Sequence, residues 1–212
     1  MKTAYSMCVL SCVIFLLGCT AMQLAGDVNS GRQALIIGKN EEAATYFRTA
    51  AEKDPNYLYG TPLRQGIWSY VGRTDYALGR LPQAREALER ALAANKEEDI
   101  ARLYLGLTLA RQGDRQRGLQ EIEGGLTGIH GWLEYITQAF RFSFGQFWDP
   151  SREIRAAIES DLAMISGKDI EWQRLIGSGE WIGKRIEEES DLARLQESRE
   201  WSRESDGNSD EP

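Results

Sequence analysis

The sequence predicts an all-α fold, an α-solenoid of three helix-turn-helix repeats closed by a C-terminal helical cap. Pairs of glycines seven residues apart occur three times, and the residues after each pair keep one register. A small residue follows the second glycine after five positions, a large apolar one after nine and a small one after twelve. Because one helical pair cannot bury its apolar face alone, at least three stacked pairs and a cap are expected for stability.

Each repeat is predicted to be two antiparallel helices. The first glycine of a pair lets the second helix approach closely, and the second glycine takes the left-handed conformation that ends the first helix. The pairs are Gly31 and Gly38, Gly72 and Gly79, and Gly106 and Gly113; the register positions are Ala43, Phe47, Ala50, Ala84, Leu88, Ala91, Gly118, Ile122 and Gly125.

The first two copies are offset by 41 residues and the last two by 34, so seven extra residues fall in the segment 54–62. We expect this insertion to be a loop, with Thr61 as the N-cap of the next helix and Pro62 in its first turn. Pro82 is likewise predicted to lie just inside the start of a helix.

The second copy carries Trp68, Val71 and Gly72, then Ala84 and Leu88, and it resembles the tetratricopeptide repeat, a 34-residue helix-turn-helix. Matching positions in the other copies are Gly31, Ala43, Phe47, Pro55, Leu105, Gly106 and Ile122. The copies depart from the family at Ala34, Asp75 and Leu109, where tyrosine is usual. The resemblance covers about residues 25–130.

This resemblance implies a concave surface, lined by the first helix of each repeat, that binds extended peptides or partner helices. Carried over to this chain, the family's inner positions are Arg32, Leu35, Ser69, Arg73, Tyr76, Leu103, Leu107 and Arg111. Arginines beside a tyrosine suit an acidic or C-terminal peptide. Alternatively, three repeats form only a shallow groove that the cap fills.

Residues 131–200 are predicted to be the helical cap. The aromatic segment 132–148 is either core of this cap or an open surface for a partner or lipid, since Phe142 lies off the helical stripe. Further helices are expected from Asp149 and from Asp169, with a break at Gly177-Ser178-Gly179. Residues 201–212 are expected to be a disordered acidic tail.

The N-terminus carries the features of a targeting signal. Lys2 precedes an apolar stretch from Met7 to Leu17, too short for the roughly 20 residues of a spanning helix. It ends in Leu16-Leu17-Gly18-Cys19, which resembles the lipobox of bacterial lipoproteins. The resemblance implies a signal peptide at 1–18, lipid attachment at Cys19 and a membrane tether at 19–24. An uncleaved anchor or an ordinary secretory signal is the alternative, and Thr20 in place of aspartate favours the outer membrane.

Composition excludes several functions. The net charge is -7, with 25 basic and 32 acidic residues, which disfavours nucleic-acid binding. Cysteines cluster near the N-terminus and His130 is the sole histidine, so no zinc ligand set, cofactor or catalytic motif is expected. The run Glu187-Glu188-Glu189 is interpreted as a solvated helix face, because consecutive side chains on a helix diverge.

The leading hypothesis is therefore a non-enzymatic, lipid-anchored adaptor in the bacterial cell envelope, on the periplasmic face of the outer membrane. Its partner would be another envelope protein or peptide. The alternative is an envelope carrier of a small or lipidic ligand associated with a transport system, using the aromatic segment 132–148. An envelope hydrolase is disfavoured, since no catalytic constellation is visible.

Overall fold

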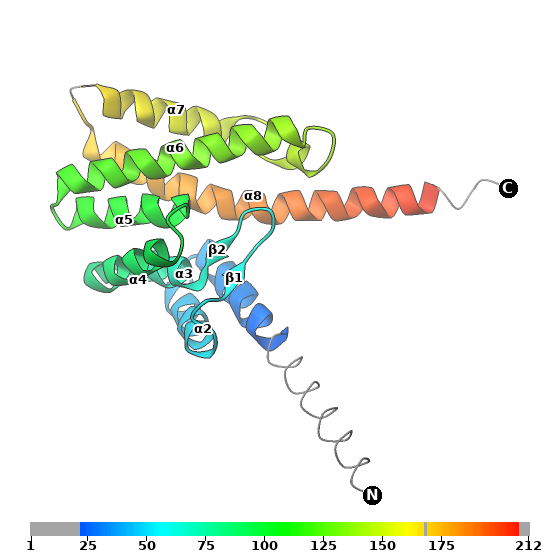
Figure 1. Ribbon diagram of the computed structural model, residues 1–212, viewed down its shortest axis with the longest axis horizontal. Coiled ribbons are helices and arrows are strands. Elements are labelled where there is room, and N and C mark those ends of the chain that lie inside the picture. Colours follow the sequence, from blue (N-terminus) through cyan, green and yellow to red (C-terminus); the bar gives the residue numbers. More distant parts are fainter. Residues whose placement is uncertain (1–21, 168, 208–212) are drawn as a thin grey trace, which may run out of the picture.

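A computed structural model of the chain describes residues 22–167 and 169–207, with residues 200–207 described by their backbone alone. This part of the chain consists mainly of helices packed in antiparallel pairs (Figure 1). The repeats comprise a first helix over 22–36 and then α2 (Asn40–Lys53), α3 (Ile67–Ala77), α4 (Leu81–Ala94), α5 (Asp99–Arg111) and α6 (Arg115–Ala139). The cap adds η1 (Phe144–Phe147), α7 (Glu153–Ser166) and α8 (Trp172–Gly207). The predicted all-α solenoid of three helical pairs with a helical cap is confirmed.

The glycine pairs work as predicted. The second glycine of each pair has a positive φ, 79° at Gly38, 72° at Gly79 and 96° at Gly113, and each follows the end of a helix. At Gly72, an added Cβ would lie 2.5 Å from the Leu88 side chain, so Leu88 of α4 packs directly on the backbone of α3. Pro82 lies in the first turn of α4, also as predicted.

The insertion between the first two repeats differs from the expectation. It contains a minimal antiparallel ladder of β1 (Leu58–Tyr59) and β2 (Gln65–Gly66), although the sequence predicted no strand. The interpretation of Thr61 and Pro62 as a helix start is wrong. They form a cis peptide bond between the strands, and α3 begins at Ile67, whose side chain is buried and whose backbone N–H donates to the Tyr57 carbonyl.

The boundary between repeats and cap falls inside a helix. Helix α6 runs 25 residues to Ala139, because the buried stripe that includes Ile129 continues through Leu133 and Ile136. His130 therefore lies inside α6, and it contacts Glu159 of α7. Helix α7 begins three residues after Pro150, and the Asp149 carboxylate accepts hydrogen bonds from backbone N–H groups in its first turn.

Helix α8 is continuous through Gly177-Ser178-Gly179, so the predicted break is wrong. It begins at Trp172 instead of Asp169 and includes residues 201–207 of the predicted disordered tail; residues 208–212 lie outside the described residues. Its part up to Arg194 contacts the repeats and the other cap helices, and its distal part projects beyond them (Figure 1). Residues 22–24 of the predicted tether belong to the first helix.

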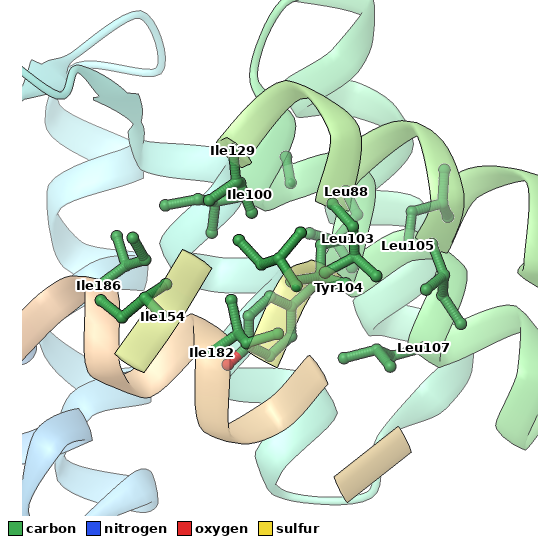
Figure 2. Close-up of a cluster of buried hydrophobic side chains, with 14 of the residues drawn as sticks. Leu88, Ile100, Leu103, Tyr104, Leu105, Leu107, Ile129, Ile154, Ile182 and Ile186 are labelled. Carbon is green, nitrogen blue, oxygen red and sulfur yellow. The ribbon is translucent and has the colours of Figure 1, made fainter. Parts of the chain in front are cut away.

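The main core joins the repeats to the cap. Leu103 and Tyr104 of α5, Ile154 of α7, and Ile182 and Ile186 of α8 meet in one buried cluster (Figure 2). The cap is thus part of the same hydrophobic unit as the second and third repeats.

Candidate functional site

The concave side of the repeats is occupied by α8. Two glycines of α8 make this contact close: a Cβ at Gly179 would lie 2.9 Å from Leu107, and one at Gly183 would overlap the ring of Tyr104. Ile182 and Ile186 of the same helix point into the core (Figure 2). The glycines that suggested a helix break instead let α8 lie directly on α5.

A buried charge cluster ties α8 to the first two repeats. Arg32 Nε donates to Glu187 Oε2 at 2.8 Å, and Arg73 Nη1 donates to Glu187 Oε1 at 2.5 Å. Gln65 Nε2 donates to the same Oε1 at 2.7 Å. Arg32 also pairs with Asp191 at 2.9 Å, so two guanidinium groups meet two carboxylates of one helix.

Burial raises the pKa of Glu187, but Arg73 and Arg32 outweigh burial and lower this pKa to about 2. Burial lowers the pKa of both arginines, but Glu187 and neighbouring tyrosines, joined by Asp191 at Arg32, together outweigh burial, so both pKa values lie above their usual range. The cluster therefore stays ionised, and removing one partner would leave an uncompensated charge in the interior.

Beside this cluster a cleft of about 260 Å³ remains between α8 and the repeats; we call it the residual cleft. Its apolar walls include Leu35, Ile36 and Ala77, and its charged groups include Arg111 of α5 and Lys184 of α8. The lining residues are Leu35, Ile36, Asn40, Arg73, Tyr76, Ala77, Tyr104, Arg111, Glu180, Lys184 and Glu187. The cleft can therefore receive a ligand that combines apolar and anionic groups.

Comparison with protein-family models matches residues 72–123, which begin at Gly72 in α3 and end at Glu123 in α6, to the tetratricopeptide repeat. This part of the chain is a tetratricopeptide repeat. Such domains are typically non-catalytic and bind other proteins. No curated protein and no solved structure matches the chain.

The eight candidate groove residues lie on or beside the inner surface of the repeats, but most are covered. Six of them are buried, namely Arg32, Ser69, Arg73, Tyr76, Leu103 and Leu107. Leu35 is half-buried and Arg111 is exposed. The groove is therefore not open in this conformation. It is filled by the cap, which was the alternative expectation: α8 contributes carboxylates that pair with the arginines and apolar side chains that pack on the leucines. Partner binding by these residues stays a prediction.

Sequence reasoning missed the residues that complete this surface. The interpretation of Glu187-Glu188-Glu189 as solvated is wrong for Glu187 and Glu189, which are buried. Glu189 accepts a hydrogen bond from the backbone N–H of Asp149 at 3.0 Å. A signal was present in the small residues Gly179 and Gly183, which precede Ile186 and Glu187 on one side of α8.

The aromatic segment 132–148 mainly contributes to the core. Trp148 is buried, and Trp132 packs against it edge-to-face with ring centroids 4.8 Å apart. Tyr135 and Phe142 are the exceptions, and Phe142 is 85% exposed. The core interpretation therefore describes most of the segment, and no observation favours a carrier of lipidic ligands.

Cys19 and the predicted signal peptide 1–18 lie outside the described residues. Among the helices that the structure describes, none combines the length and apolarity needed to cross a bilayer. Within the same residues, no group of three or more His, Cys, Asp or Glu side chains is placed to hold a metal.

Proposed function

We propose that this protein is a non-enzymatic adaptor of the bacterial cell envelope, held to the membrane by a lipid on Cys19. It binds an acidic segment of another envelope protein or peptide through the residual cleft. The observation that carries the proposal is the cleft itself, because it exposes Arg111 and Lys184 beside apolar walls on a tetratricopeptide repeat. The resemblance of residues 16–19 to a lipobox supports the lipid anchor, and Thr20 in place of aspartate favours the outer membrane.

Site-specific photocrosslinking in cells tests the adaptor role. A photoreactive amino acid at Ala77, an exposed position in the cleft, should yield a discrete crosslinked product identifiable by mass spectrometry. The same amino acid at Gln120, exposed on α6 and outside the cleft, is the control. Equal crosslinking at both positions, or none at Ala77, would argue against a partner in the cleft.

Cell fractionation tests the anchor separately. Cys19→Ala removes the acceptor of the lipid, so the protein should leave the membrane fraction or accumulate as an unprocessed precursor of higher mass. Unchanged mass and membrane association in this variant would exclude lipidation at Cys19.

A further inference from the structure

Helix α8 presents two carboxylates to the concave side of the repeats, and their surroundings differ. Glu180 and Glu187 are seven residues apart, two helical turns, so they lie on nearly the same face. The Glu187 side chain is 3% exposed and meets guanidinium nitrogens at 2.5 Å and 2.8 Å. The Glu180 side chain is 45% exposed and lies 4.0 Å from Arg111. One carboxylate is buried between two guanidinium groups, and the other is partly exposed to solvent.

The groups that hold Glu180 are fixed by other contacts. Tyr76 packs edge-to-face on Tyr104 with ring centroids 5.5 Å apart, and its hydroxyl donates to Glu180 Oε1 at 2.5 Å. Burial, then the contact with Glu180, raises the pKa of Tyr76, so the phenol remains a proton donor. Arg111 lies over the Tyr76 ring, 4.6 Å from its centroid. A carboxylate position is therefore preformed at the mouth of the residual cleft.

Resting on the proposed function, we infer that Glu180 is an internal substitute for the partner's carboxylate. An acidic side chain of a bound peptide takes its place at Tyr76 and Arg111, while Glu187 keeps α8 docked. Apolar side chains next to that acid pack on the cleft walls at Leu35 and Ile36, and Lys184 offers a second charge on the rim.

The exchange is feasible at Glu180 and not at Glu187. Glu180 is 45% exposed, so it can turn into water when the acid of the peptide takes over both the hydrogen bond from Tyr76 and the weak ion pair with Arg111. Removing Glu187 would leave Arg73 buried without a counter-charge and Arg32 paired with Asp191 alone. The partner's acid is thus selected by charge complementarity with Arg111 and Lys184, and α8 itself limits access to that site.

Peptide binding by the full chain in detergent tests this inference. The probe is a fluorescein-labelled Leu-Glu-Leu-Glu amide, measured by fluorescence anisotropy, with a Leu-Gln-Leu-Gln amide for comparison. Glu180→Gln should tighten binding of the acidic peptide about tenfold, because it removes a competitor. Arg111→Gln should weaken it by a similar factor. Glu171→Gln is the matched control, since it removes the same charge from a position outside the cleft.

Three outcomes would overturn the inference: equal affinity of wild-type protein and Glu180→Gln, an equal gain in Glu171→Gln, or equal binding of the two peptides. Thermal unfolding of each variant by circular dichroism checks that it is folded. If Ala77 crosslinks a partner in cells while Glu180→Gln has no effect, the substitute role fails and the adaptor stands. If Ala77 crosslinks nothing while Glu180→Gln tightens peptide binding, the cleft chemistry stands and the cellular adaptor role fails.

Discussion

Glu187 and Glu98 are both buried carboxylates that contact residues distant in the chain, and their pKa values shift in opposite directions. Glu187 meets two arginines of the repeats, so its pKa falls to about 2 despite burial. Glu98 accepts one hydrogen bond from the backbone N–H of Gly66 at 2.9 Å, and burial raises its pKa to about 7. At Glu187 the two arginines outweigh burial, whereas at Glu98 burial outweighs the lowering effects of Gly66, Ser69 and Arg73.

Glu187→Gln should lower the free energy of unfolding at pH 7 by about 3–5 kcal/mol, because it leaves the buried Arg73 without a counter-charge and Arg32 with Asp191 alone. Since the folded-state pKa lies below the ordinary 4.5, this stabilisation is complete above pH 4.5 and is lost as pH falls toward 2. Urea unfolding followed by circular dichroism measures it. Glu188→Gln, at a half-buried neighbouring position, is the control and should change the free energy of unfolding little. If Glu187→Gln were still as much less stable than wild type near pH 2 as at pH 7, the ionised Glu187 would not be the source of the stabilisation.

Glu98→Gln should act in the opposite direction. Because the folded-state pKa is raised to about 7, the charged form destabilises the native state as pH rises from about 4.5 through 7. The variant keeps an acceptor for Gly66 and carries no charge, so it should be more stable than wild type by about 3 kcal/mol at pH 8. The two proteins should converge at pH 5 in thermal unfolding. A constant difference at both pH values would refute the burial effect.

Glycines allow some neighbouring helices to pack with their backbones in direct contact. An added Cβ at Gly106 would lie 2.5 Å from the backbone nitrogen of Ile122, which cannot move without separating α5 from α6. Gly131 lies in α6, and a Cβ added there would have no atom within 4 Å. The same residue type therefore has different roles in neighbouring helices.

Gly106→Ala should destabilise the protein by about 1–3 kcal/mol or more through overpacking. Gly131→Ala should stabilise it by about 0.5–1 kcal/mol through helix propensity. Chemical unfolding of the two variants under identical conditions makes the comparison. If both substitutions stabilise the protein, α5 and α6 have room for a methyl group at Gly106.

Helix α8 covers the concave side of the repeats and so joins the whole molecule together. It covers Arg32, Arg73, Leu103 and Leu107, and the residual cleft stays open beside them. The distal part of α8 projects beyond the other helices, so it covers less of the concave surface (Figure 1).

Truncation after Ser166 should expose the concave face, abolish the sharp unfolding transition and increase binding of a dye specific for apolar surface. Truncation after Arg199 removes only the distal part of α8 and should shift the melting temperature by no more than about 2 °C. Differential scanning calorimetry distinguishes the two. A sharp transition in the shorter chain would mean that the repeats fold independently of the cap.

Local patterns predicted the repeats well. Gly38, Gly79 and Gly113 end helices with positive φ, and Phe47, Leu88 and Ile122 are buried at the expected positions. These features depend on contacts between helices adjacent in the chain, so a short periodic pattern is sufficient to reveal them.

The candidate site was less predictable. The inner positions of the repeats were identified by resemblance, but the residues that fill them, such as Glu187, were assigned to solvent. Gly179 suggested a helix break because the same residue type either ends a helix or permits close packing. Only its neighbour Leu107 distinguishes the two roles.

The amino-acid pattern thus specifies paired helices and their stacking, because each repeat interacts with the next repeat along the chain. Tertiary structure decides which part of the concave surface stays open. Arg32 and Glu187 are 155 positions apart, and no local spacing records that they meet. Burial of a charge is favourable only with its partner present, so the fate of these side chains depends on how the whole chain packs.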